Sequence, residues 1–258
     1  MEIIGAAQFR ALPAVGLPEM VKVGQVLRDY TLRELQPQLE PVQELPPGQP
    51  DAQQLPQLIF GQPPQRALYF SSDGRFVAQL QRDRIAINER RTPQEGGADP
   101  SSEHVWPELR KLSECVQTTL AGRDVEYGPH RPTFVELTYV NTIAPTPGVW
   151  SKHDELHRVL RIVAGKAGEA PWSKVERAAV RFSFPILEAD RFIGRLHVAA
   201  EPSYAEGMPM LNLNLITRRV VDESQSLEDV FHACHCDAVE AFVAITTARM
   251  HDYWGRLK

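Results

Sequence analysis

The sequence has few cysteines, no long apolar run and no excess of positive charge. Its 258 residues include three cysteines, and Cys115 lies far from Cys234 and Cys236, so their odd number and spacing do not make a disulfide framework. No apolar run approaches the roughly 18 residues of a membrane-spanning helix, and the short apolar run at residues 3–7 predicts no signal peptide. The formal net charge of −5 gives no electrostatic footprint for nucleic acid. These absences predict a reduced, soluble, cytoplasmic protein.

The usual catalytic signatures are also missing. The sequence contains no G-x-S-x-G serine elbow, P-loop, G-x-G-x-x-G or H-E-x-x-H motif, and no pair of acids at a spacing that suggests acid–base chemistry. Cys115 falls near the apolar stripe of a predicted helix with no histidine signature beside it, which argues against a nucleophile. These absences favour a protein that is not an enzyme, with an enzyme kept as an alternative, and we expect no cofactor.

The pattern of apolar residues predicts alternating groups of strands and helices. A hydrophobic fraction of 43% is sufficient for a large core. The first part reads as a strand, a helix, a connector rich in proline and glutamine with a short strand inside it, three strands in an antiparallel meander, and a second helix. The ranges are 2–9, 19–35, 36–65 (short strand 58–60), 66–71, 75–81, 84–89 and 106–120. The second part repeats this order, with strand 133–143, helix 151–163, and strands 177–187, 192–200 and 208–221.

The chain ends in a predicted amphipathic helix over 227–254. Apolar residues recur there at steps of three and four, which places them on one stripe. The stripe consists of Leu227, Phe231, Cys234, Ala238, Phe242 and Ile245. Ser224 and Ser226 are both candidate N-caps, and Gly255 stands where a helix stop is expected. A helix of this length can cross a whole sheet.

The repeated order of elements suggests an internal duplication. We expect an α+β fold with antiparallel sheets, long helices on one face, and two halves at 1–125 and 126–258, each a β-α-β-β-β-α unit. Two weak sequence similarities support this duplication. Residues 67–71 resemble residues 179–183, and residues 74–77 resemble residues 194–197. The alternative is an unrepeated α+β domain.

The succession of short motifs along the chain resembles a sporadically distributed family of bacterial proteins of similar length with no assigned function. The residues that carry the resemblance are Gly5-Ala6-Ala7-Gln8-Phe9, Gln79 to Arg84 with Asn88, Leu137 to Asn141, Gly194 to His197, Leu211-Asn212-Leu213, and His235, Phe242, Thr246-Thr247, Met250 and Trp254. The resemblance implies a bacterial α+β protein without known catalytic residues. Cys236-Asp237 stand where the family more often has Glu-Trp, which puts in doubt a shared role for the positions beside His235.

Three groups of residues are candidates for binding. Tyr139 and Asn141 share one face of a predicted strand. They either form hydrogen bonds within a buried polar network or bind a ligand or partner backbone. His232, His235 and Cys236 are weak candidates for a metal site, because only two or three of these side chains can converge on one helix. The alternative for them is a packed cysteine and a hydrogen-bonded histidine.

A short basic cluster is the third candidate. Arg82 and Arg84, with Arg90 and Arg91 nearby, are echoed by Arg218-Arg219. Such residues either protect a solvated sheet edge or form a phosphate- or RNA-binding strip, although interleaved aromatics are missing.

We expect a non-catalytic protein that binds a macromolecule, of antitoxin, immunity or defence type, through the open sheet face with Arg82 and Arg84 or through the connector. The second hypothesis is an enzyme or small-ligand binder with a site between the halves that uses Tyr139, Asn141 and His235. The third is a nucleic-acid binder that uses the sheet face. Association of the chain with itself stays open.

Overall fold

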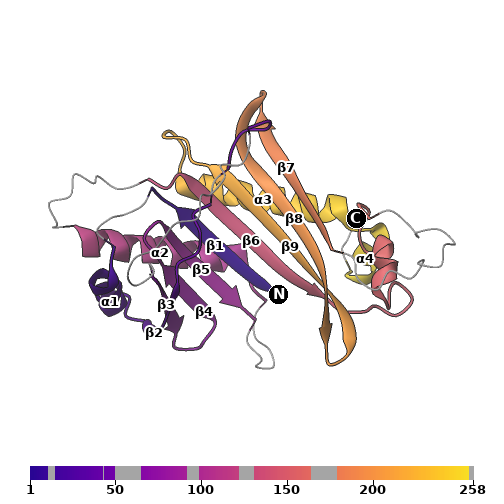
Figure 1. Cartoon of the computed structure of the whole chain (residues 1–258), viewed down its shortest axis with the longest axis horizontal. Coiled ribbons are helices and arrows are strands. Elements are labelled where there is room, and N and C mark those ends of the chain that lie inside the picture. The colour runs from indigo at the N-terminus through magenta and orange to yellow at the C-terminus, as the bar shows by residue number, and fades with distance from the viewer. Residues whose placement is uncertain are drawn as a thin grey trace.

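A computed structural model describes residues 1–10, 15–42, 44–49, 65–91, 99–121, 131–163 and 179–255. The short strand expected at 58–60 lies outside these residues. The described chain forms a nine-stranded antiparallel sheet with helices packed behind it (Figure 1). The strands are β1 (Glu2–Gln8), β2 (Tyr30–Pro37), β3 (Gln65–Ser71), β4 (Phe76–Leu80), β5 (Arg84–Arg90), β6 (Phe134–Ile143), β7 (Val180–Glu188), β8 (Arg191–Ala205) and β9 (Met208–Val220). The helices are α1 (Leu17–Val26), α2 (Ser102–Leu120), the 3₁₀ helix η1 (His153–Arg158), α3 (Leu227–Ile245) and α4 (Ala248–Tyr253).

The two parts of the chain share this sheet. Its strand order is β2-β3-β4-β5-β1-β6-β9-β8-β7, and β1 pairs with β6 along its whole length, with Gly5 opposite Leu137. We call the β1–β6 line the seam. The expected α+β class with antiparallel strands is confirmed.

The helix-covered face of the sheet is apolar because its strands alternate. Ile3 and Leu137 point toward the helices and are almost fully buried, whereas Glu136 points to the opposite face. The buried side chains fall into two clusters, a first that includes Ile3 of β1 and Leu137 of β6 and a second that includes Leu213 and Leu215 of β9. Helix α3 contributes to both, with Phe231 to the first and Ile245 to the second. It therefore ties the two clusters together behind the sheet.

Gly5 lets both helices approach the seam. A Cβ atom at this position would lie 2.6 Å from Val105 of α2 and 2.8 Å from Phe231 of α3. Both helices therefore pack closely over β1, since a side chain here would force one of them outward.

Three of the predicted helices are shorter in the structure than the sequence predicts. The helix expected over 19–35 ends at Val26, and Tyr30 begins β2, because the alternating residues after it pair with β3. The helix expected over 151–163 is only the 3₁₀ turn η1. The single helix expected over 227–254 breaks at Thr246, which is extended and forms a β-bridge with Leu160. In each case pairing with a distant segment overrides the local apolar period.

Removal of α3 and α4 should prevent soluble folding. A chain that stops before Leu227 exposes the apolar face of β6 and β9, including Leu213 and Leu215. We expect insoluble expression, measured by fractionation and by circular dichroism of any soluble material. Soluble protein that unfolds cooperatively would contradict this expectation.

Candidate functional site

The candidate residues Tyr139 and His235 meet at the seam. The Tyr139 hydroxyl lies 2.6 Å from Nδ1 of His235, and the Ser102 hydroxyl lies 3.2 Å from the same nitrogen. Burial is the main cause that lowers the pKa of His235, and the neighbouring His232 lowers it further. Burial raises the pKa of Tyr139. Both groups are therefore neutral near pH 7, and the imidazole nitrogen can accept a hydrogen bond from the phenol.

A groove of about 310 Å³ lies beside this cluster, between α3, α4 and the sheet. We call it the seam groove. It is lined by Met1, Tyr139, Asn141, Leu215, Ala238, Val239, Phe242 and Trp254. Two of the three residues predicted for a site between the halves therefore line one groove. His235 does not line it, but it contacts the groove through Tyr139.

Apolar side chains at the rim of the seam groove are exposed to solvent. The exposed fractions are 45% for Met1, 36% for Val239 and 37% for Trp254, and Tyr253 next to Trp254 is 58% exposed. Asn141 is the polar side chain of the lining besides Tyr139, and its amide nitrogen lies 3.4 Å from the carbonyl oxygen of Leu213. The groove is thus suited to an apolar group that ends in a single hydrogen-bonding function.

The opposite face of the sheet carries a network of ion pairs. Glu136 on β6 accepts hydrogen bonds from Arg84 of β5 at 2.5 Å and from Arg218 of β9 at 2.6 Å. Burial acts to raise the pKa of Glu136, but the two guanidinium groups outweigh it and lower that pKa. Arg84 and Arg218 therefore hold a buried carboxylate.

The interpretation of the basic cluster as a solvated sheet edge is wrong for Arg84 and Arg218. Strands β5 and β9 are interior strands, and the edges of the sheet are β2 and β7. Arg82 is exposed in the turn between β4 and β5. Arg82 and Arg84, which the sequence places in one basic cluster, thus have different roles. Arg82 lies in an exposed turn, whereas Arg84 lies on an interior strand.

The described part of the connector, residues 38–42 and 44–49, crosses this same face (Figure 1). The backbone N–H of Leu39 donates to the side chain of Gln81 at 3.1 Å, near the turn between β4 and β5. Farther along the connector, Glu44 accepts hydrogen bonds from Arg195, His197 and Arg218 of β8 and β9. The connector is therefore fixed to the sheet at both places.

The metal candidates do not converge. The sulfur of Cys236 lies 3.7 Å from Nε2 of His232, whereas His235 points toward Tyr139 with its ring 6.1 Å from that of His232. Among the described residues, no group of three or more His, Cys, Asp or Glu side chains is arranged to hold a metal ion.

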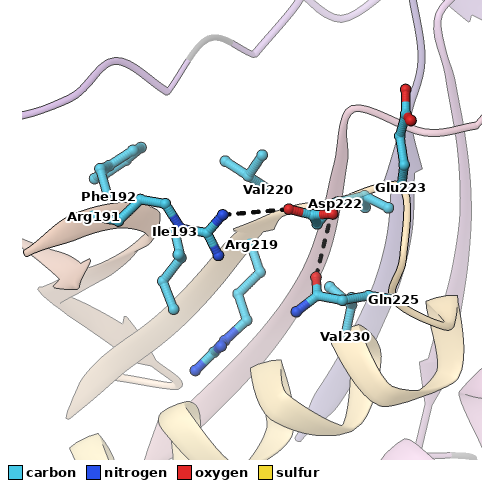
Figure 2. Close-up of a pocket in the computed structure, with 10 residues that line it drawn as sticks. Arg191, Phe192, Ile193, Arg219, Val220, Asp222, Glu223, Gln225 and Val230 are labelled. Atoms are coloured by element: carbon cyan, nitrogen blue, oxygen red, sulfur yellow. Dashed lines mark hydrogen bonds and ion pairs between the residues drawn. The ribbon is translucent and has the colours of Figure 1, made fainter. Parts of the chain in front are cut away.

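A second cleft, of about 420 Å³, lies between the β7–β8 turn and the start of α3. Figure 2 shows Arg191 directed at Asp222, 3.3 Å away, and Arg219 pointing away from them. Arg219 forms a bidentate pair with Asp237 of α3 at 2.6 and 2.8 Å. Both arginines of this cleft are thus engaged by carboxylates of the chain itself.

The comparisons with known proteins give little information about function. The sequence matches no family model and no curated protein. Among solved structures, DynU16, a protein of the dynemicin biosynthetic locus, aligns at 14% identity over 71% of this chain and 69% of its own, with a TM-score of 0.26. In the part of the chain that the structure describes, no helix is long and apolar enough to span a membrane.

Sequence reasoning missed Glu44, Glu136 and His197. Glu136 and His197 lie on predicted strands, and their alternation with apolar neighbours could have placed them on the polar face. Nothing in the composition of the connector distinguishes Glu44 from its other polar residues. Its partners are about 150 residues away in the chain, so only the folded sheet reveals them.

Charge reversal should distinguish Arg84 from Arg82. Arg84→Glu places a second carboxylate against buried Glu136, and we expect a loss of roughly 3 kcal/mol in unfolding free energy. The exposed Arg82→Glu is the matched control and should change stability by less than about 0.5 kcal/mol. Urea denaturation measures both, and equal midpoints for the two variants would contradict the assignment.

Glu44 should make stability depend on pH in the acidic range. Burial acts to raise its pKa, but hydrogen bonds from His197 and Arg218 outweigh it and lower the pKa to about 2 from an unfolded value of 4.5. A lowered folded pKa gives stability that is present above pH 4.5 and lost as the pH falls toward 2. We expect Glu44→Gln to show a shallower decrease in unfolding free energy than the wild type over this window. Parallel curves would contradict the ion-paired state of Glu44.

Proposed function

We propose that this protein is a non-catalytic binding protein whose partner is another protein that inserts an apolar side chain into the seam groove. The observation that carries the proposal is the coincidence of a groove with a rim of exposed apolar residues. Met1, Val239 and Trp254 line the groove, and all three are also exposed to solvent. On soluble proteins, large contiguous apolar patches rimmed by polar residues are typical of interaction sites and ligand-binding grooves.

The size and chemistry of the groove fit one anchor residue of an interface. About 310 Å³ accommodates an aromatic or large aliphatic side chain. Interfaces concentrate their binding energy in such buried anchors, surrounded by contacts that exclude water. Asn141 lies at the groove wall, where it can orient a polar end of the anchor, such as a phenol.

The resemblance to a sporadically distributed bacterial family favours a partner encoded beside this gene, as in antitoxin, immunity or defence systems. Sporadic occurrence is typical of such genes, whose products act on one cognate protein. We propose a cytoplasmic location because the three cysteines, Cys115, Cys234 and Cys236, are free thiols.

We further propose that the two halves arose by duplication of a β-α-β-β-β-α unit. The strand order supports it, because β1 is followed outward by β5, β4 and β3, and β6 is followed outward by β9, β8 and β7. Helices α2 and α3 follow corresponding strands, and both pack behind the sheet. The seam groove then lies where the two units meet.

A small apolar ligand is the second candidate for the groove. Its volume lies at the lower end of the range for ligand pockets, roughly 300–1,000 Å³. Asn141 is a polar side chain of the groove wall and can hydrogen-bond to a molecule with one hydroxyl or carbonyl group. Native mass spectrometry of the purified protein distinguishes a retained small molecule from a bound protein.

A charged residue at the rim should abolish binding. Val239→Arg places a guanidinium beside the apolar lining, and we expect at least a tenfold loss in affinity for the protein that the wild type retains from its host. Val21→Arg is the matched control, because Val21 is a helix residue of similar exposure, 42%, on α1. Affinity is measured with purified partner by calorimetry. Equal binding by both variants would contradict the seam groove as the binding surface.

A further inference from the structure

Glu44 is held on the sheet in the manner of a bound ligand. One carboxylate oxygen accepts hydrogen bonds from His197 at 2.6 Å and from Arg218 at 2.8 Å, and the other accepts from Arg195 at 2.8 Å. The Glu44 side chain is only 3% exposed. Charge-assisted bonds to both oxygens of a carboxylate are the strong form of recognition of this group.

The three donors are supplied by strands, and each has a contact within the sheet, although Arg195 also donates to the backbone carbonyl oxygen of Leu45 in the connector. His197 is fixed through its other ring nitrogen, which lies 2.9 Å from the Ser183 hydroxyl of β7. Arg218 is fixed by its bond to Glu136. Arg195 packs over the ring of Phe192 on its own strand, 5.4 Å from the ring centre. His197 and Arg218 are therefore held by the sheet itself, whereas Arg195 is held by both the sheet and the connector.

The cluster of ion pairs around Glu136 and Glu44 carries more positive than negative charge. Arg84, Arg195 and Arg218 carry three positive charges, and Glu136 supplies one negative charge among them. Glu44 is the second acid, and it comes from the connector. Without Glu44, this cluster would have two positive charges in excess, beside a histidine.

We propose that Arg195, His197 and Arg218 form a carboxylate-binding site on the sheet face, which Glu44 occupies as an internal ligand. The external ligand is a carboxylate-bearing molecule, such as an acidic side chain of another protein, that displaces Glu44 and frees the connector from the sheet. The site is separate from the seam groove, which lies on the helix-covered face, so the two proposals stand or fall independently.

Removal of Glu44 should make the site accessible to a small carboxylate. A tethered group competes at an effective concentration in the millimolar range, so the wild type should respond little to acetate. In Glu44→Ala we expect sodium acetate at pH 7 to raise the melting temperature in a saturable manner by about 2–4 °C. Sodium chloride at equal ionic strength is the control for screening, and Glu40→Ala is the control for loss of an exposed connector acid.

Three results distinguish a carboxylate-binding site from a general salt effect and from a site that prefers phosphate. A saturable acetate effect in Glu44→Ala, with a change in the His197 ring signals in NMR and no such effect in Glu40→Ala, supports the site. Equal effects of acetate and chloride on Glu44→Ala overturn it. Stabilisation by phosphate at lower concentration than by acetate overturns the assignment to carboxylates. If Glu44→Ala does not fold, Glu44→Gln keeps the shape of the side chain, and the same salts are compared on it.

Discussion

The pairing of β1 with β6 is the constraint on which the rest of the structure depends. It joins two groups of strands into one sheet, and it places Gly5 opposite Leu137 under the two principal helices. Because Gly5 has no side chain, Val105 of α2 and Phe231 of α3 can both approach β1. Tyr139 of β6, its partner His235 and the seam groove, which Met1 also lines, all lie beside this pair of strands.

The two faces of the sheet are stabilised in different ways. The helix-covered face is held by burial of apolar side chains, which α3 extends across both core clusters. The opposite face is held by charges, with Glu136 and Glu44 bridged by Arg218. Apolar burial is not directional, whereas the ion pairs require defined partners.

The seam groove and the charged face show how one sheet can present two separate surfaces. The groove arises because the helix layer leaves a hollow bounded by α3, α4 and the sheet, with Met1 at its rim. The charged face arises because strand alternation places Arg84 of β5, Glu136 of β6 and Arg218 of β9 on one side of the sheet, with Glu136 directly opposite Arg218 and β1 between β5 and β6. Neither surface depends on residues of the other.

The sequence by itself determined the strands of both meanders, helix α2, the start of α3 at Ser226 and the apolar stripe that α3 buries, because these follow from local alternation, period and capping. It also identified Tyr139, Asn141 and His235 as residues of one region. It failed where a distant segment decides the local structure: Tyr30 begins β2 because β3 pairs with it, and Thr246 ends α3 because Leu160 pairs with it. Only the tertiary structure brought Glu44 to Arg195, since that contact spans the chain and depends on the order of nine strands, which local residue patterns do not encode.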